Sequence, residues 1–475
     1  NMAAPDRSAP THWDIETREN ILWSTQLGSQ NYGNPVVAGG KILVGTNNAA
    51  GFRPDKHPAD EDRGCLVCLD EKTGRFLWQL TREKLDRVED WPEMGICSTA
   101  CVVGDRVYIV TNRCEVVCLD LNGFLDDEND GPYQEEVDSS PQDADIIWLF
   151  DMREKLGVVP HNMSTSSPTV HGDYLFLVTS HGLDEAHEKL PNPDAPSFLC
   201  LHRQTGEVIW QDASPNPGIL HGQWSSPTLG EVDGKMLVFF PGGDGWVYAF
   251  DVEKSAEQKK GVLVWKYDLN PKDAKHAHGG RGDKSEIVGT PVFYEGSVIA
   301  ATGQDPEHGE GVGYLCRIDA SKQGDITETG TIFRRGGATG EGRRRKYDFR
   351  RTISTVAVHD GLIFAADLSG YLHCIDLKTG ERYWEHDMLA AIWGSPMVIG
   401  DKVYIGDEEG DIAIFAVSKE LNLISEKTVG APVYSTPVVA NGVLYIAARG
   451  ELFAIAEKKP EGGAEKDDGK ENPEK

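Results

Sequence analysis

Residues 353–384 read ISTVAVHDGLIFAADLSGYLHCIDLKTGERYW, and this stretch decides the fold. Alternating or β-branched residues occupy 354–358, 362–367 and 371–376, and a fourth run at 381–384 ends in Trp384. Short runs of this kind predict four β-strands. The connections between them contain glycine, which tolerates the positive φ of hairpin turns. Such a small antiparallel sheet cannot bury both faces, so the pattern predicts further copies that stack against it.

The first strand and its turn recur eight times, for example as NPVVAGGKILVGT from Asn34 and STPVVANGVLYIAA from Ser435. The third strand recurs eight times as well, and it usually ends in Asp. Three copies then continue through Thr-Gly into a tryptophan, and two more reach a tryptophan after longer inserts: Trp78, Trp210 and Trp384, then Trp148 and Trp265. Phe333 takes this place in one unit, and the unit after Ser418 has no aromatic residue there.

The two ends of the repeat array complement each other. The last unit lacks a fourth strand, whereas ILW at 21–23 precedes the first unit with nothing to pair with. Pairing of these segments closes a ring and removes the open sheet edge. We therefore predict an all-β fold, an eight-bladed β-propeller of four-stranded antiparallel blades over residues 21–456, closed by an N-terminal strand. Residues 1–20 form an N-terminal extension, and the charged residues 457–475 a disordered tail.

The motif Asp-x-x-Thr-Gly-x-x-x-Trp, preceded by Ser-x-Pro-Val-Val-x-Gly-x-Val-Tyr, resembles the quinoprotein-like (PQQ-like) propeller repeat over nearly the whole chain. This family, of WD40/YVTN-like architecture, includes dehydrogenases dependent on pyrroloquinoline quinone (PQQ) and the lipoprotein scaffold of the outer-membrane β-barrel assembly machinery. The resemblance implies tryptophans that dock between blades and an extracytoplasmic location, in the periplasm or cell envelope. It leaves the function open, because one fold hosts many functions.

The formal net charge of −29 restricts the partners. An acidic surface repels phosphate backbones, so we expect no nucleic-acid partner. No apolar run approaches the length of a membrane span. We expect a monomer.

The cysteines follow the repeat. Four of the nine share a position that is Ala in other blades, which indicates buried packing sites: Cys68, Cys118, Cys200 and Cys374. Cys65 and Cys68 have CxxC spacing, but in a strand they face opposite sides, so they are not a metal or haem motif. The sequence does not decide whether a disulfide forms among Cys97, Cys101 and Cys114, since its formation depends on an oxidising compartment.

The long loops gather on one face of the predicted ring. The connections between second and third strands, and several crossings between blades, are expanded at 47–64, 81–95, 180–197, 267–286, 304–311 and 334–351. Loops on a rigid scaffold commonly carry binding sites, so we place a site on this face, over the mouth of the channel. The alternative is that the loops only cap the channel.

One column of the repeat lies two residues before the Ser, Thr or Asn that precedes the repeat proline. It reads Tyr32, Cys97, Thr165, Trp224, Val288, Ile353, Trp393 and Tyr434. Because the first strand of each blade is innermost, this column is expected near the channel mouth. Its aromatic members, with Gln223 beside Trp224, are our candidate ligand-binding residues, able to stack on a flat ring. They could equally be a plug of aromatic core.

Two loops group possible cation ligands. Gln304, Asp305, Glu307 and His308 form the candidate metal site, and His181, Asp184, Glu185 and His187 form a similar set two blades away. Carboxylate and amide oxygens suit Ca²⁺. Solvated surface charge is the alternative.

Arg350 and Arg351 end the one basic run of the chain, which begins at Arg343. They are candidates to hold an anionic ligand by bidentate pairing. A loop neutralised by neighbouring carboxylates is the alternative.

Two functions follow. The first is a binding or scaffold module that contacts a protein, a glycan or a small-molecule ligand through the loop-rich face. The second, by family resemblance, is a PQQ-dependent alcohol or sugar dehydrogenase with Ca²⁺. The chain has no adjacent cysteine pair of the kind that the resemblance implies for the dehydrogenases, which favours the first.

Overall fold

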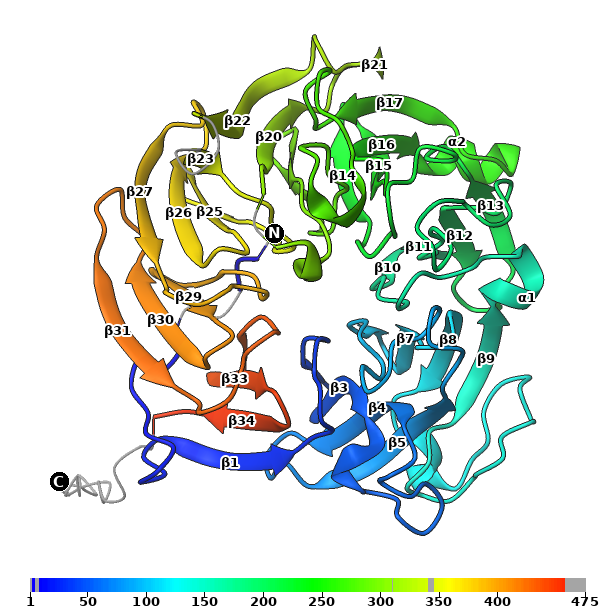
Figure 1. Cartoon of the computed structure of the whole chain (residues 1–475). Coiled ribbons are helices and arrows are strands. Elements are labelled where there is room, and N and C mark those ends of the chain that lie inside the picture. Colours follow the sequence, from blue (N-terminus) through cyan, green and yellow to red (C-terminus); the bar gives the residue numbers. More distant parts are fainter. Residues whose placement is uncertain (1, 5–7, 310, 341–345, 458–475) are drawn as a thin grey trace, which may run out of the picture.

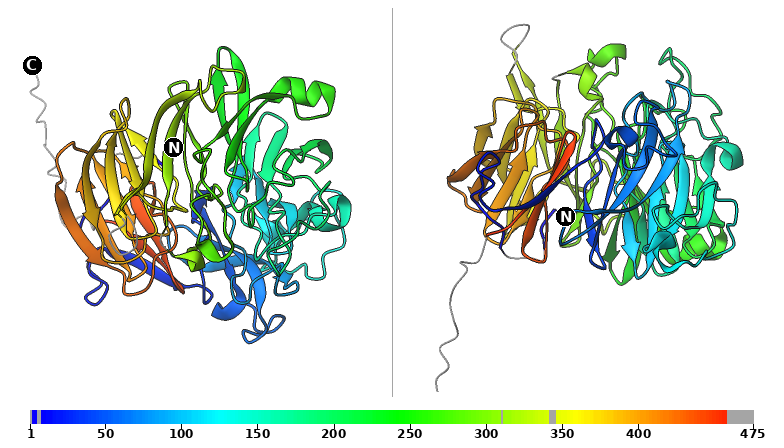
Figure 2. Two further views of the ribbon diagram at one scale, coloured as in Figure 1. Left: turned by 45° about the horizontal axis from the view of Figure 1, so that its top comes forward. Right: turned by 90° about the horizontal axis from the view of Figure 1, so that it is seen from below.

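The computed structural model describes residues 2–4, 8–309, 311–340 and 346–457, and eight β-sheets stand around a central axis (Figure 1). This confirms the predicted eight-bladed propeller. The side views of Figure 2 show the N-terminal segment, in blue, against the orange and red blades. Most of the predicted tail (458–475), Arg343–Arg345 and Glu310 lie outside the described residues.

The blades follow each other along the chain, and each is given from its innermost strand outward. Blade 1 contains β2 (Val36–Ala38), β3 (Lys41–Asn47), β4 (Arg63–Asp70) and β5 (Phe76–Glu83). Blade 2 contains β6 (Cys101–Val103), β7 (Arg106–Val110), β8 (Glu115–Asp120) and β9 (Ile146–Asp151). Blade 3 contains β10 (Thr169–His171), β11 (Tyr174–Val178), β12 (Phe198–His202) and β13 (Val208–Asp212). Blade 4 contains β14 (Thr228–Val232), β15 (Lys235–Pro241), β16 (Trp246–Asp251), β17 (Leu263–Asp268) and β21 (Gly324–Asp325).

The second half of the ring completes the circle. Blade 5 contains β18 (Val292–Tyr294), β19 (Ser297–Ala301), β20 (Tyr314–Asp319), β22 (Thr331–Thr339) and β23 (Lys346–Phe349). Blade 6 contains β24 (Ala357–His359), β25 (Leu362–Ala366), β26 (Tyr371–Asp376) and β27 (Arg382–Asp387). Blade 7 contains β28 (Met397–Ile399), β29 (Lys402–Gly406), β30 (Asp411–Ala416) and β31 (Leu423–Thr428). Blade 8 contains β32 (Val438–Ala440), β33 (Val443–Ala448), β34 (Glu451–Ile455) and β1 (Ile21–Gln26).

Short helices decorate the loops: α1 (Met152–Leu156), α2 (Val252–Gln258), η1 (Asn48–Ala50), η2 (Gly123–Asp126), η3 (His278–Gly280) and η4 (Pro306–His308). Two outer strands were not predicted. In blade 4, β21 adds a parallel strand, and in blade 5, β22 continues into a hairpin with β23. From the sequence, residues 334–351 are expected to form a long crossing between blades, so the prediction is wrong for this hairpin.

The ring closes as predicted, because β1 pairs antiparallel with β34 from Ile21 opposite Ile455 to Gln26 opposite Glu451. Figure 1 shows the blue strand beside the red one. The N-terminal extension also docks on the ring. Ala3 forms a parallel bridge to Val398 in the innermost strand of blade 7.

The repeat tryptophans join neighbouring blades by a hydrogen bond as well as by packing. Each indole Nε1 donates to the carbonyl group that follows the third strand of the next blade, at 3.0–3.2 Å. The pairs are Trp23 with Glu71, Trp78 with Leu121, Trp148 with Arg203, Trp265 with Ala320, and Trp384 with Ser418. Trp210 is the exception, with a buried Nε1 that has no partner among the described residues. The corresponding residue in its next blade, Val252, begins α2, where the carbonyl points along the helix to a backbone N–H.

The Asp, Thr and Gly of the repeat motif form the turn against which the aromatic ring of the preceding blade packs. In blade 6, Asp376 Oδ1 accepts hydrogen bonds from the backbone N–H and hydroxyl of Thr379 at 2.8 and 3.0 Å. Gly380 follows with φ +74°, and a Cβ there would lie 2.6 Å from the Phe333 ring of blade 5. Two features therefore exclude a side chain at position 380: the positive φ of the backbone, and the aromatic ring of the preceding blade.

Blade 7 lacks a repeat tryptophan, and a residue outside the repeats supplies one. Trp13, from the N-terminal extension, is 1% exposed and packs among buried residues of blades 7 and 8, including Ile414 and Phe453. Its Nε1 donates to the carbonyl oxygen of Thr428 at 3.2 Å. The extension thus completes the interface between the last two blades.

All nine cysteines are free thiols, and Cys68, Cys118, Cys200 and Cys374 are buried, as predicted for packing positions. Cys65 and Cys68 belong to different core clusters, so the CxxC side chains face opposite sides of the blade. No helix in the described ranges is both long and apolar enough to cross a membrane.

Candidate functional site at the channel mouth

A collar of hydrogen bonds runs around the inside of the ring, at the residue that precedes the repeat proline. The backbone N–H of this residue donates to the side-chain oxygen of its counterpart in the next blade, at 2.8–3.1 Å. Seven such links are formed: Asn34 to Thr99, Thr99 to Ser167, Ser167 to Ser226, Thr290 to Thr355, Thr355 to Ser395, Ser395 to Thr436, and Thr436 to Asn34. The recurring Ser, Thr or Asn therefore fixes the spacing of the innermost strands.

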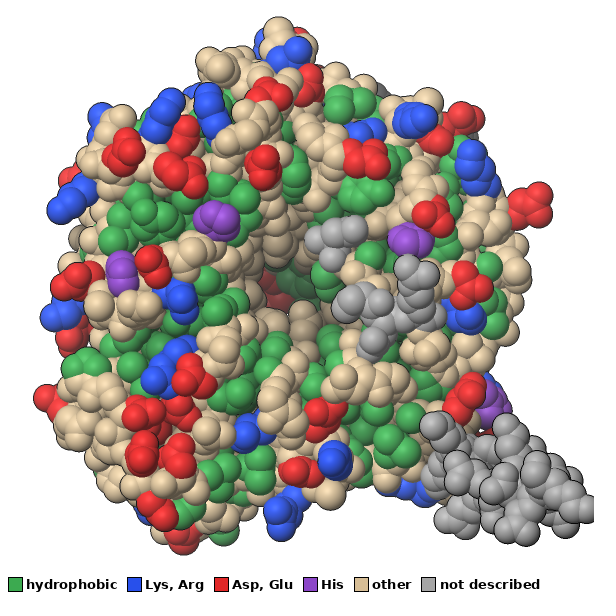
Figure 3. Space-filling view, turned by 180° about the vertical axis from the view of Figure 1, so that it is seen from behind, with side chains coloured by type: hydrophobic (Ala, Val, Ile, Leu, Met, Phe, Trp, Pro, Cys, Tyr) green, Lys and Arg blue, Asp and Glu red, His purple; other side chains and the backbone are tan. Residues whose placement is uncertain are grey.

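A cavity of about 290 Å³ lies on this collar. All eight members of the predicted column line it, two residues before the collar positions. Residues of the long loops complete its wall, among them Trp91, Met94, Asn162, Met163 and the segment 304–307. The structure thus brings the column and the loop-rich face together at one site, which we call the mouth cavity. Figure 3 shows that the opposite face is also hollowed at the centre of the ring.

Aromatic rings occupy two sides of the mouth cavity. Tyr32 stacks on Tyr434 with ring centroids 5.2 Å apart, and Trp393 lies 4.8 Å from Tyr434. Trp224, from blade 4, belongs to the opposite side of the ring, and its Nε1 donates to the carbonyl of His161 at 2.9 Å. All four side chains remain half-buried. Tyr32, Trp393 and Tyr434 pack against one another, as the alternative of an aromatic core plug predicts. All four aromatic side chains nevertheless line the cavity.

The electrostatic character of the mouth cavity is neutral to acidic. Its described lining contains Asp305 and Glu307 and no Lys or Arg. Burial raises the pKa of Tyr32, so its phenol stays protonated at neutral pH. PQQ is a tricarboxylate, and carboxylates in a binding site require cationic or multiple N–H donors. The described lining therefore does not fit this cofactor.

The two candidate arginines do not line the mouth cavity. Arg351 is 1% exposed and donates to the backbone carbonyls of Gly280 and Gly282 at 2.8 and 2.7 Å. Arg350 lies over the ring of Tyr371, 4.5 Å from its centroid. Gln223 is also internal, since it donates to the carbonyl of His181 and to Ser197 Oγ, both at 2.9 Å. These three side chains hold loops in place around the site.

The candidate metal residues share one loop, but they bond to each other and to the backbone. Gln304 donates to the carbonyl of Lys284 at 3.1 Å and pairs through Oε1 with His308 Nδ1 at 3.1 Å. Asp305 Oδ1 caps η4 by accepting from the N–H of Glu307 at 2.9 Å. In the second set, Asp184 Oδ1 accepts from the backbone N–H groups of 188 and 189 at 2.9 and 3.2 Å. A different group of three histidines in the described part of the chain places one possible metal-binding atom each within 4.8 Å of the others: His161, His187 and His221.

A buried acid that the sequence does not predict lies near the mouth cavity. Glu286 is 1% exposed, and neither carboxyl oxygen has a hydrogen-bond partner among the described residues. Burial, with a smaller contribution from Asp305, raises the pKa of Glu286 to about 8. No local pattern distinguishes this residue from the exposed acids of the same loop, because its burial arises from packing of distant segments.

We expect Glu286→Gln to flatten the pH dependence of stability. Between its ordinary pKa of 4.5 and the folded value of about 8, the folded protein keeps a proton that the unfolded chain releases. The free energy of unfolding therefore falls as pH rises through this window, by up to about 1.4 kcal/mol per pH unit from this group. Urea unfolding of both proteins at pH 5, 6, 7 and 8 measures the difference. Equal pH slopes in the two proteins would contradict it.

Comparison with known proteins agrees with this architecture. The family model described as outer membrane protein assembly factor BamB matches residues 9–140 and 133–461. BamB from Moraxella catarrhalis is 15% identical, with a TM-score of 0.55, over 92% of this chain and 97% of that one. Quinohemoprotein alcohol dehydrogenase from Comamonas testosteroni is 13% identical, with a TM-score of 0.58, over 96% and 80%. Identities this low show the fold alone.

One curated relative matches a short segment. A 1-butanol dehydrogenase (cytochrome c) from Thauera butanivorans is 40% identical over 65 residues, which are 12% of this chain and 9% of the relative. A match over less than a tenth of that enzyme does not carry its activity to this chain. The family model, in contrast, covers nearly the whole repeat region, so the chain belongs to the PQQ-repeat propeller family described as outer membrane protein assembly factor BamB.

Proposed function

We propose that the protein is an extracytoplasmic binding module whose mouth cavity takes a neutral sugar ring of a glycan. The observation that supports this most is the column of eight repeat residues around one cavity of about 290 Å³, with aromatic rings from blades 1, 7 and 8 and Trp224 across from them. The family resemblance supports the extracytoplasmic location. The BamB family and the quinoprotein enzymes are both represented among the similar proteins.

The chemistry of the lining matches a sugar. Aromatic faces pack against the apolar C–H face of a ring, while a few polar groups fix its orientation. The polar groups are amides, hydroxyls and acids, including Asn34, Asn162 and Glu307. These accept hydrogen bonds from sugar hydroxyl groups. The collar beneath them holds the lining in a fixed geometry, which lowers the entropy lost on binding.

The charge of the lining selects against anions. Asp305 and Glu307 line the cavity, and its described lining contains no Lys or Arg. An acidic sugar or a tricarboxylate would bring like charges into a partly desolvated site. We therefore expect neutral glycans to bind in preference to acidic ones, and PQQ with Ca²⁺ not to bind.

The test is a titration of the full chain with panels of neutral and acidic oligosaccharides, and with PQQ plus Ca²⁺, followed by tryptophan fluorescence and calorimetry. Trp393→Ala and Trp224→Ala are each expected to weaken binding of a neutral member about tenfold, because an aromatic contact contributes roughly 1.5 kcal/mol. Tyr294→Ala serves as the matched control, since this half-buried tyrosine ends β18 outside the cavity lining.

Four outcomes would overturn or replace the proposal. One is that no neutral oligosaccharide binds at millimolar concentration. The second is binding that Tyr294→Ala weakens as much as Trp393→Ala. The third is saturable binding of PQQ with Ca²⁺ that Trp393→Ala abolishes, which would return the protein to the dehydrogenase class. Binding of a partner protein through the same tryptophans, without glycan binding, would also replace the glycan proposal.

A further inference from the structure

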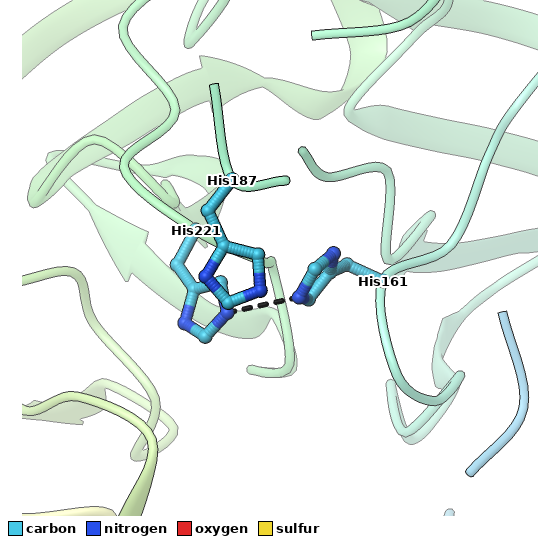
Figure 4. A group of neighbouring side chains, drawn as sticks. All are labelled: His161, His187 and His221. Carbon is cyan, nitrogen blue, oxygen red and sulfur yellow. Dashed lines mark hydrogen bonds between the residues drawn. The ribbon is translucent and has the colours of Figure 1, made fainter. Parts of the chain in front are cut away.

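Three histidines from separate loops meet beside the mouth cavity. His161 lies between α1 and β10, His187 in the hairpin between β11 and β12, and His221 between β13 and β14. Their ring centroids are 4.5–4.7 Å apart, and the three metal-binding atoms lie within 4.8 Å of one another. Figure 4 shows the rings converging from three directions.

Two of the rings face each other nitrogen to nitrogen. His161 Nε2 and His221 Nε2 are 2.9 Å apart, both on side chains that are at most 3% exposed. The Nδ1 of His161 lies 2.7 Å from the carbonyl oxygen of Leu183, which can only accept. Nδ1 therefore carries the proton, and Nε2 presents its lone pair to the cluster. A ring N–H held by a backbone carbonyl is the arrangement that orients histidine ligands in metal sites.

The loops that carry the cluster are tied together before any ligand binds. The N–H of Leu183 donates to the carbonyl of His221 at 2.9 Å, while its own carbonyl receives the His161 ring. Gly182 lets these loops approach, because a Cβ there would lie 2.7 Å from His161 Cβ and 2.8 Å from the His221 carbonyl. Preorganisation of this kind holds the loops in place and so limits the rearrangement that binding requires.

His161 and His221 are buried, so the inner side of the cluster is shielded from solvent. His187 is only half-buried, so the cluster opens to solvent on its side.

From this geometry we propose that His161, His187 and His221 form a site for a transition metal, with Zn²⁺ as its expected occupant. Three imidazole ligands with an open fourth position suit Zn²⁺, which prefers nitrogen and sulfur ligands and tetrahedral geometry. Ca²⁺ and Mg²⁺ take oxygen ligands, which this cluster does not offer. Metal–nitrogen distances of about 2.0–2.1 Å require the facing nitrogens of His161 and His221 to separate by a few tenths of an ångström. The nitrogen of half-buried His187, within 4.8 Å of theirs, moves toward them.

The site adjoins the mouth cavity. Trp224 lines that cavity and also packs edge-on against His221, with ring centroids 5.0 Å apart. The metal site is a second binding function, independent of the glycan proposal, since it rests on different side chains. Trp393→Ala, on the far side of the cavity, is expected to leave metal binding unchanged.

The test is a titration of chelator-treated full-length protein with Zn²⁺, in competition with a chromophoric chelator. We expect one Zn²⁺ per chain and an affinity that falls at least about 100-fold in His187→Gln and in His221→Gln, because each removes a ligand. His359→Gln is the matched control, since His359 ends β24 in a tight turn of blade 6. Co²⁺ substitution is expected to give the strong visible absorption of tetrahedral coordination.

The proposal would be overturned if the wild-type protein did not bind Zn²⁺ at high micromolar concentration. It would also be overturned if His187→Gln and His359→Gln bound equally well, or if Co²⁺ gave only the weak spectrum of octahedral coordination. His221→Gln removes a buried ring and can unfold locally. His187→Gln changes a half-buried side chain, and near-ultraviolet circular dichroism of the metal-free variant checks its fold.

Discussion

Replacing Trp265 by alanine is expected to lower the free energy of unfolding by about 4 kcal/mol. The indole is fully buried between blades 4 and 5, where it packs with residues such as Phe239 and Ile318. Its removal leaves a cavity, because the sheets on both sides are held by their own ladders and cannot collapse into it. It also leaves the carbonyl of Ala320 without its indole donor.

The phenylalanine variant separates these contributions. Trp265→Phe keeps most of the buried area and loses the hydrogen bond to Ala320, so we expect a loss of about 1–2 kcal/mol. Blade 5 uses Phe333 at this repeat position, so the interface between blades 5 and 6 is built with the smaller ring. Equilibrium unfolding in urea, followed by far-ultraviolet circular dichroism, measures both variants. A loss below 1 kcal/mol for Trp265→Ala would contradict the docking role.

Trp13→Ala is expected to destabilise the ring by about 3 kcal/mol, although Trp13 lies outside every repeat. The side chain is 1% exposed between blades 7 and 8, and its Nε1 donates to Thr428. This interface has no repeat tryptophan, so the N-terminal extension supplies the large buried side chain that the other interfaces build from their own blades. The expected loss is smaller than at Trp265, because the extension is held by fewer strands and can relax.

His12→Ala is the control for Trp13, since the neighbouring side chain is exposed and pairs with Glu19 on the surface. It is expected to change the free energy of unfolding by less than about 0.5 kcal/mol. Limited proteolysis gives a second readout, because loosening of the extension exposes the chain near β1 at the ring closure. Equal stability of Trp13→Ala and His12→Ala would show that the extension does not contribute to the ring.

Most of the fold was predictable because every blade repeats the same local chemistry. Alternating apolar residues, glycine turns and the Asp-x-x-Thr-Gly-x-x-x-Trp motif predicted eight sheets and the closure by residues 21–23, and β1 pairs with β34 as expected. The predicted strand bounds were less accurate at the inner edge. The strand predicted at 354–358 is observed only at Ala357–His359, because the backbone N–H of Thr355 bonds to Ser395 of the next blade.

The candidate site was predictable only in part. The column containing Tyr32, Trp224, Trp393 and Tyr434 could be read from the repeat register, and all eight of its members line the mouth cavity. The basic run could not be placed in the same way. Arg351 lies among backbone carbonyls from the crossing near Gly280, and nothing in the repeat specifies how long insertions fold against each other.

The sequence by itself determined the number of blades, the ring closure, the buried cysteines and the residues that face the channel. All of these follow from periodicity, since each repeat position has one environment in every blade. Only the tertiary structure decided which insertions meet, and so revealed the burial of Glu286 and the docking of Trp13. It also decided the meeting of His161, His187 and His221, which are 60 residues apart from first to last and come from three different loops. Contacts between insertions depend on packing across blades, for which the repeat carries no pattern.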